Sequence, residues 1–303
     1  MTPVSLLLKT IYNRWVSNKK KLIGVRMNPP SLTADQHDIA QDIATCFVES
    51  RRTAQALAEF PGQIPANLED AYQVQDAAIG LNGRRIGGWK VGRIPLDLEQ
   101  QFGIDRLGGP IFGATIHEVA SGSIIDMPVF VGGFAAVEAE YVAVIAEDAP
   151  ADKSTWTTDE ASAMISDLRI GLEIASSPLS TINELGPPVV VSDFGNNFGL
   201  VVGPSIRDWR SRSLDTMSCR TYIEDRLAGD GGAFNLTGGF VRSVQFLLEL
   251  TARRGRPLRA GDFVATGQTT GIHDIAVGQT GTTDFGDDGR LGISAVAAQP
   301  FTA

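Results

Sequence analysis

Two glutamates interrupt an apolar segment, residues 137–145, and this limits the folds open to the chain. In a β-strand successive side chains alternate between two faces, so Glu138 and Glu140 share one face, roughly 7 Å apart. Val142 and Val144 continue that face, which is therefore apolar and favours burial. Two carboxylates at the end of a buried face repel each other and lose hydration, which costs several kcal/mol unless something compensates.

A divalent cation would remove both problems. A third carboxylate, Glu173, lies in another apolar strand-like run, residues 170–175. Three carboxylates without histidine or thiolate suit a hard ion, Mg²⁺ or Mn²⁺, with positions open for water and substrate. In the alternative interpretation, Glu138 and Glu140 lie on a solvated sheet edge and Glu173 forms a salt bridge. The spacing alone leaves both interpretations open.

The rest of the pattern predicts an α+β fold, in which a helical N-terminal region leads into a mixed, barrel-like β-roll core. Apolar residues at helical spacing predict a helix that begins at residue 33 and another at residues 68–81. A third predicted helix begins at Thr157 and includes Met164, Ile165 and Leu168, and a fourth spans residues 240–254. Short β-type runs lie at residues 124–130, 137–145, 170–175, 189–191, 200–202, 221–224, 263–266 and 293–297. Strands and helices do not alternate regularly, which argues against a doubly wound parallel sheet.

Composition excludes several classes of protein. The chain has 303 residues, 43% hydrophobic and 20% charged, which excludes a disordered or collagen-like chain. No run approaches the roughly 18 apolar residues of a membrane helix, so no membrane partner is expected. The net charge of −9 argues against a nucleic-acid partner. Cys46 and Cys219 lie far apart, as expected for reduced thiols of a cytoplasmic protein.

The N-terminal segment differs from the rest in charge. Residues 1–34 contain basic residues and no acidic one. We expect residues 1–32 to be a disordered or spurious extension. Residues 33–303 are then predicted to form a single catalytic domain, with a helical part at 33–86 and the β-roll core at 87–303.

Lys90 is a second candidate for chemistry. It lies in a short strand-like segment among glycines and beside Trp89. A lysine so placed could have a lowered pKa and act as an acid or base, or it could hold a substrate carboxylate. The alternative is an exposed lysine on a turn.

Two polar breaks are candidates for substrate binding. The turn after residues 261–265 contains Gln268 and Thr270 between glycines, and the break at residues 192–197 contains Asn196 and Asn197. Each break can aim polar groups at an anion, or it can be a simple connecting loop. No serine lies in a Gly-x-Ser-x-Gly setting, which argues against a serine hydrolase.

The elements taken in order resemble the 2-oxopent-4-enoate hydratase group of the fumarylacetoacetate hydrolase superfamily. The resemblance covers about residues 35–300 and rests on segments at residues 88–92, 101–105, 109–112, 137–141, 172–176, 193–203 and 260–267. It implies a mixed β-roll, a Mg²⁺ or Mn²⁺ site and a homo-oligomer. It places Glu138, Glu140 and Glu173 on the metal-ligand positions and Lys90 on the active-site lysine.

The chain departs from these hydratases at two points. An aspartate usual before the Phe of a Leu-Phe pair is missing, which leaves Asp105 as the nearby catalytic candidate. At residues 193–197 a serine contact is absent, so Asn196 or Asn197 is expected to replace it. His117 and Glu118 could instead correspond to the His-Glu pair of the hydrolase branch, although their place in the chain does not match it.

The resemblance implies a metal-dependent lyase acting on a small 2-oxo acid. The predicted reaction adds water to a 2-hydroxy-2,4-dienoate to give a 4-hydroxy-2-oxo acid, as in aromatic meta-cleavage catabolism, with Lys90 moving protons. One alternative is a 2-oxo-3-enedioate decarboxylase or β-diketone hydrolase of the same superfamily. Another alternative is a non-catalytic subunit that pairs with a catalytic homologue.

Overall fold

The helices of the N-terminal part lead into strands of two sheets. The computed structural model describes residues 34–301, so the extension predicted at residues 1–32 lies outside the described residues. The domain assignment to residues 33–303 stays a prediction. The described helices are α2 (Ala34–Thr53), α3 (Leu68–Asn82), α4 (Leu96–Phe102), α5 (Thr158–Ala163), α6 (Pro187–Ser192) and α7 (Gly239–Arg253).

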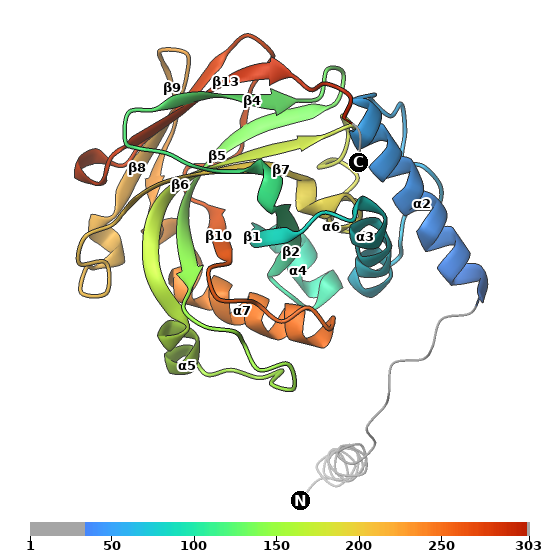
Figure 1. The fold of residues 1–303 in the computed structure, drawn as a ribbon, viewed down its shortest axis with the longest axis horizontal. Coiled ribbons are helices and arrows are strands. Elements are labelled where there is room, and N and C mark those ends of the chain that lie inside the picture. The colour runs from blue at the N-terminus through green and yellow to red at the C-terminus, as the bar shows by residue number, and fades with distance from the viewer. Residues whose placement is uncertain (1–33, 302–303) are drawn as a thin grey trace, which may run out of the picture. The chain divides into compact units, whose positions relative to one another are not determined.

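The larger sheet is mixed, with parallel and antiparallel neighbours (Figure 1). Its strands in spatial order are β2 (Arg106–Phe112), β1 (Ile86–Arg93), β10 (Phe263–Gln268), β5 (Phe134–Ile145), β6 (Ile165–Ser177), β7 (Asn197–Ser205) and β3 (Ile116–Glu118), with β11 (His273–Asp274) beside β5. The smaller sheet has the order β4 (Ile124–Val129), β13 (Arg290–Ala297), β12 (Thr280–Asp284), β8 (Ser218–Ile223) and β9 (Arg226–Gly232).

The two faces of β5 have different neighbours. Tyr141 belongs to the main core and its ring packs edge-on against Phe285, with the ring centroids 5.4 Å apart. Val142, one residue on, belongs to a separate buried cluster with Leu200 and Ala265. The face that carries the glutamates is therefore closed by apolar side chains at one end, as the alternating pattern predicted.

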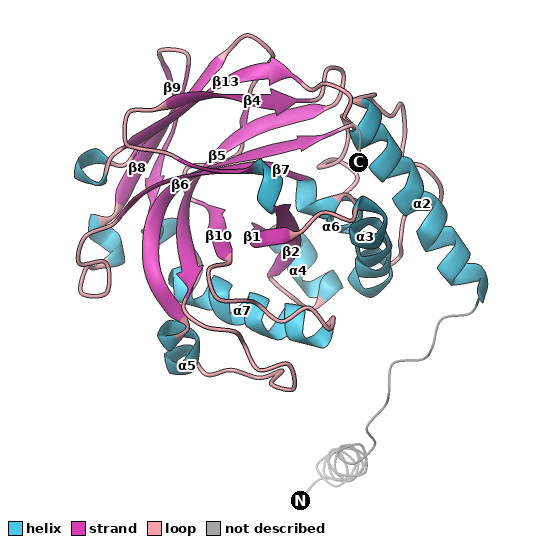
Figure 2. Cartoon of the chain, in the orientation of Figure 1, coloured by secondary structure: helices cyan, strands magenta, loops and turns pink. Residues whose placement is uncertain are grey.

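Helices lie beside the edge of the larger sheet that β2, β1 and β10 form. Figure 2 shows α3, α6 and α7 close to β1, β2 and β10. Helix α3 is capped at its start by Asn67, whose side chain accepts a hydrogen bond from the Asp70 amide, and at its end by Gly83, which has φ 67°. Among the described residues, no helix combines the length and apolar character needed to cross a membrane.

Two assignments made from the sequence were wrong. Residues 189–191 lie in helix α6 rather than a strand, because Pro187 and Pro188 start a helix and its valines are buried on several sides. The helix capped by Thr157 ends at Ala163, and Ile165 and Leu168 belong to β6. Both errors concern short runs with few apolar residues, in which periodicity does not separate helix from strand.

Candidate metal centre and active site

Strands β5 and β6 bring the three predicted glutamates together. The strands are antiparallel, and Glu138 lies directly opposite Glu173 in the register. Glu140 shares the face of Glu138. All three side chains are buried, and one carboxylate oxygen from each lies within 4.8 Å of the other two. The solvated-edge interpretation is therefore wrong for Glu138 and Glu140, and the three acids form one cluster.

Burial and mutual repulsion disfavour the charged forms of two of these acids. Burial raises the pKa of Glu138 to about 7, with Lys90 opposing the rise and Glu173 adding to it. Burial, then the charges of Glu173 and Glu138, raise the pKa of Glu140 well above its ordinary value. A group with fixed positive charge at this position would reverse both effects.

The cluster also has unused oxygen atoms. Glu140 Oε1 and Glu173 Oε2 are buried and have no hydrogen-bond partner among residues 34–301. Buried carboxylate oxygens without partners are costly, and an all-oxygen donor set is the one preferred by hard divalent cations. The residues present therefore fit a divalent cation, which the three carboxylates would hold.

Lys90 lies against the cluster and offsets part of its negative charge. It lies on β1, is 4% exposed, and its Nζ is 3.2 Å from Glu173 Oε1. Burial lowers the pKa of Lys90, but Glu173, Glu138 and Glu140 together raise it above its ordinary value. The lowered pKa suggested by the sequence is therefore wrong for this environment, since the three carboxylates favour the ammonium form.

The asparagines of the polar break lie on two sides of the cluster. Asn197 Nδ2 donates to Glu173 Oε1 at 3.0 Å, which orients that carboxylate. Asn196 lines a cavity of about 240 Å³ with Lys90 and Glu138, and its buried Oδ1 has no hydrogen-bond partner in the part of the chain that the structure describes. We call this space the Lys90 cavity; it is also lined by Arg93, Leu98, Leu107, Asn183, Gln268 and Ile272.

Gln268 and Thr270 have different surroundings. Gln268 lines the Lys90 cavity, whereas the Thr270 hydroxyl contacts the side chains of Thr221 and His273. The turn also supplies a backbone donor, because the Gly267 amide donates to Glu140 Oε2 at 2.6 Å. This turn therefore supports the cluster, and only Gln268 faces the space beside Lys90.

Asp105 lies in a neighbouring cavity rather than beside Lys90. That cavity, of about 280 Å³, is lined by Asp105, Arg106, Thr270 and also by Arg93 and Gln268. Asp105 forms an ion pair with Arg106 at 2.9 Å. We call this space the Arg106 cavity.

The remaining candidates lie outside the cluster. His117 and Glu118 are exposed on β3, and Glu118 pairs with Arg169. They do not line the Lys90 cavity. Cys46 is exposed and Cys219 is buried, and both are free thiols.

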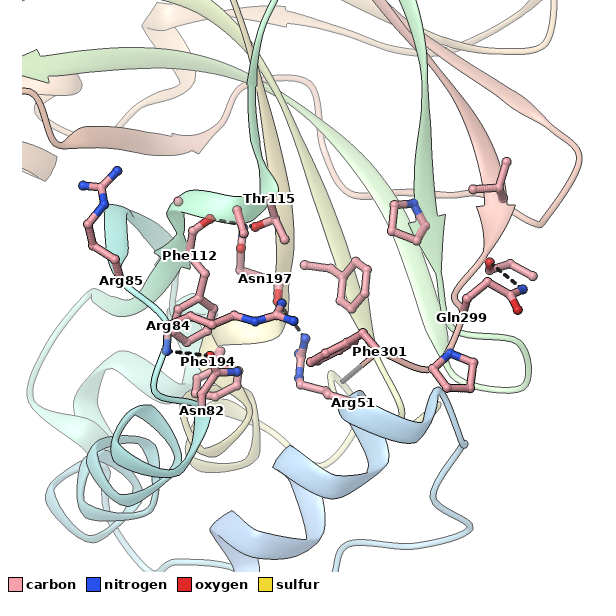
Figure 3. A pocket seen from close by; sticks show the side chains of 17 residues that line it. Arg51, Asn82, Arg84, Arg85, Phe112, Thr115, Phe194, Asn197, Gln299 and Phe301 are labelled. Atoms are coloured by element: carbon pink, nitrogen blue, oxygen red, sulfur yellow. Dashed lines mark hydrogen bonds between the residues drawn. The ribbon is translucent and has the colours of Figure 1, made fainter. Parts of the chain in front are cut away.

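A buried arginine supports the loop that carries the asparagines, and the sequence analysis missed it. Arg51 on α2 makes an ion pair with Asp193 at 2.5 Å. It also donates to the carbonyl oxygen of Asn197 at 3.1 Å (Figure 3). The ring of Phe194 lies 5.2 Å from the guanidinium carbon. Arg51 lies four residues after Phe47, on the buried face of the helix, and this spacing was the signal in the sequence that could have indicated its burial.

The far side of this loop faces a larger cavity. Figure 3 shows the space, about 780 Å³, with Arg84, Arg85 and Phe301 around it and Arg51 at its wall. Asn197 and Phe194 line it as well. The neighbouring loop residues Gly195 and Asn196 line the Lys90 cavity instead.

The loop has an unusual backbone. Phe194, Gly195 and Asn196 all have positive φ, at 55°, 68° and 63°. A Cβ on Gly195 would lie 3.2 Å from Lys90 Cδ, and one on Gly109 would lie 2.2 Å from the Phe194 carbonyl oxygen. Glycines at these two positions therefore allow the loop to close over Lys90 and β2.

Replacing Gly109 with alanine is expected to lower both stability and turnover. The added methyl group must displace the Phe194 carbonyl, and such overpacking costs about 1–3 kcal/mol. The measurement is urea denaturation of Gly109→Ala beside Gly80→Ala, a helical site where nothing lies within 4 Å. The control is expected to keep or slightly gain stability. Equal stability of the two variants would contradict the close approach described here.

The fold agrees with a known structure. The chain superimposes with a TM-score of 0.71 on 4-oxalocrotonate decarboxylase from Pseudomonas putida G7, solved with calcium and acetate, at 20% identity over 88% of this chain and 99% of that one. The two proteins share a fold. This confirms the α+β class with a mixed, curled sheet that the resemblance to the fumarylacetoacetate hydrolase superfamily implied.

Sequence comparison finds relatives that carry the name 2-keto-4-pentenoate hydratase. The chain is 26% identical over 233 residues to a 2-keto-4-pentenoate hydratase of Paraburkholderia xenovorans, covering 75% of this chain and 84% of the relative. It is 28% identical over 270 residues to one of Burkholderia vietnamiensis, covering 86% and 98%. No protein-family model matches the sequence. These likenesses support a lyase-type enzyme.

Proposed function

We propose that the protein is a metal-dependent hydratase of the fumarylacetoacetate hydrolase superfamily that adds water to a 2-hydroxy-2,4-dienoate. The observation that carries the proposal is the buried cluster of three carboxylates beside Lys90, with two oxygens lacking a partner. The relatives named 2-keto-4-pentenoate hydratase support it, as do the complexes of 4-oxalocrotonate decarboxylase from Pseudomonas putida G7 with calcium and with magnesium. The cation is proposed to be Mg²⁺ or Mn²⁺.

The residues of the chain have separable roles in this proposal. Glu138, Glu140 and Glu173 hold the cation, which supplies Lewis-acid stabilisation of negative charge on the 2-oxo oxygen. Lys90 Nζ holds a proton beside the substrate and exchanges it with solvent. Asn196 and Gln268 orient the bound acid in the Lys90 cavity, and Asn197 keeps Glu173 in place.

The proton balance of the reaction determines what Lys90 must do. The dienol loses the proton of its 2-hydroxyl group and gains one at C5, which gives a 2-oxo-3-enoate. Water oxygen then bonds to C4 and a proton is added at C3, which gives the 4-hydroxy-2-oxo acid. Lys90 serves the first of these transfers, because it lies at the 2-oxo end: it releases its own proton to solvent and takes the proton of the 2-hydroxyl group in its place, while the proton at C5 is added at the opposite end of the diene.

The proposal is tested by supplying the purified protein with Mg²⁺ and 2-hydroxypenta-2,4-dienoate. We expect the dienol absorbance to fall, 4-hydroxy-2-oxopentanoate to form, and a chelator to abolish the reaction. Glu140→Gln is expected to lose turnover and cation binding together, because it removes a ligand. Metal-bound protein that leaves this dienol and its longer homologues unchanged would disprove the hydratase assignment.

A further inference from the structure

The larger cavity, of about 780 Å³, is distinct from the spaces beside Lys90 and Arg106. We call it the Arg84 cavity. Among the described residues, it has no lining residue in common with the Lys90 cavity or the Arg106 cavity. Its volume lies within the range of roughly 300–1,000 Å³ that is typical of small-molecule sites. A ligand held in the Arg84 cavity therefore does not need to occupy the space beside Lys90.

Much of the wall of the Arg84 cavity is apolar and aromatic. Its apolar residues include Phe112, Pro128, Phe194, Phe198, Val296 and Phe301. The rings of Phe112 and Phe194 pack edge to face, with their centroids 5.0 Å apart. Aromatic walls of this kind favour burial of a flat apolar group, because apolar area leaves water and the rings make further contacts with it.

The charged residues of this wall are all arginines. Arg51, Arg84 and Arg85 line the cavity, and no aspartate or glutamate of residues 34–301 does. The charge of Arg51 is balanced, because Arg51 pairs with Asp193 at 2.5 Å. Arg84 and Arg85 form no ion pair with any residue that the structure describes. The cavity therefore has an excess of positive charge, which favours an anion.

Arg84 lies where the charged and the aromatic parts of the wall meet. Its guanidinium carbon is 3.8 Å from the centroid of the Phe301 ring, and Figure 3 shows both residues beside the same space. The hydrogen bond that the structure gives Arg84 comes from its backbone amide, to Asn82 Oδ1 at 3.4 Å. A guanidinium group that stacks on a ring keeps its N–H groups at its edge, where they suit a carboxylate.

We propose that the Arg84 cavity is a second ligand site, which binds an aromatic monocarboxylate. The carboxylate pairs with the guanidinium group of Arg84, and Arg85 adds a second positive charge at the exposed rim. The apolar body of the ligand contacts the phenylalanine rings of the wall. The inference does not rest on the proposed function, since it involves neither the three glutamates nor Lys90.

The test is calorimetric titration of the full chain with 2-naphthoate, in the presence of Mg²⁺, beside the neutral analogue 2-naphthalenemethanol. We expect one 2-naphthoate to bind per chain, about tenfold more tightly than the alcohol, because only the acid makes a charge-assisted contact. Arg84→Gln is expected to weaken 2-naphthoate binding about tenfold, and Arg85→Gln about threefold. Ala114→Trp, at an exposed position of the wall, is expected to weaken it at least tenfold by filling the cavity.

Arg93→Gln is the matched control, because Arg93 lines both other cavities and not this one. It is expected to leave 2-naphthoate binding unchanged. Equal affinity for the acid and the alcohol would overturn the inference, since the positive charge would then select nothing. Binding that is weakened by Arg93→Gln and not by Arg84→Gln would overturn it too, because the acid would occupy another cavity. The absence of 2-naphthoate binding would have the same meaning.

Two of the variants protect the test against loss of folding. Arg85 and Ala114 are exposed, so their replacements are expected to keep the melting temperature of the wild type. If Arg84→Gln unfolds, weaker 2-naphthoate binding in both Arg85→Gln and Ala114→Trp supports the inference. Unchanged binding in these two folded variants overturns it.

Discussion

Lys90→Met is expected to reduce turnover about 10²–10⁴-fold while the protein still binds a divalent cation. Methionine keeps much of the length of the side chain but provides no proton. It also removes the ammonium group that lies 3.2 Å from Glu173, so the three carboxylates lose their only basic partner within the cluster as described. We therefore expect Mn²⁺ to bind at least as tightly to the variant as to the wild type.

The measurements are steady-state turnover of the dienol and calorimetric titration with Mn²⁺. Lys153→Met is the matched control, because Lys153 is a partly exposed lysine that pairs with Glu160 at 2.7 Å away from the cluster. It is expected to change neither quantity. Near-normal turnover of Lys90→Met would remove Lys90 from the mechanism, and loss of Mn²⁺ binding would indicate damage to the site instead.

Arg51→Met is expected to lower the free energy of unfolding by about 3–5 kcal/mol, because it leaves the carboxylate of Asp193 buried without its partner. The pair is enclosed, with side-chain exposures of 6% and 0%. Turnover is expected to fall as well, since the same arginine holds the Asn197 carbonyl and thereby the loop beside Lys90. Urea denaturation and the dienol assay measure the two effects.

The neighbouring arginine offers a control, and a second substitution tests the pairing itself. Arg52 forms an exposed pair with Glu49, so Arg52→Met is expected to change stability little. Adding Asp193→Asn to Arg51→Met is expected to recover part of the loss, because the remaining buried charge is removed. A double variant as unstable as the sum of the single variants would contradict a direct interaction between Arg51 and Asp193.

The sequence predicted the positions of the three glutamates better than the positions of the polar residues around them. Alternation along β5 placed Glu138 and Glu140 on one face, because that rule is local. The pairing of Glu138 with Glu173 depends on the register of two strands separated by a helix, which local rules do not determine. Their proposed role as metal ligands stays a prediction.

The polar residues outside β5 and β6 were harder to place for the same physical reason. Asp105 and Thr270 were predicted as catalytic and substrate-binding residues, and these roles stay predictions; Asp105 lines the Arg106 cavity, and the Thr270 hydroxyl contacts Thr221 and His273. Arg51 gave no motif because its partner, Asp193, is 142 residues away. Contacts of this length are set by the assembled fold rather than by any one segment.

The division of the site between strand interiors and strand ends has a consequence for how related proteins diverge. The acids of the cluster lie within β5 and β6, where each neighbour is fixed by the ladder, whereas Arg93 and Arg106 lie at the end of β1 and the start of β2. Substitutions at Arg93 or Arg106 change the walls of the cavities and leave the pairing of β5 with β6 unchanged. We therefore expect related proteins to change the substrate that they accept through few substitutions in the cavity walls, while the three acids of the cluster stay the same.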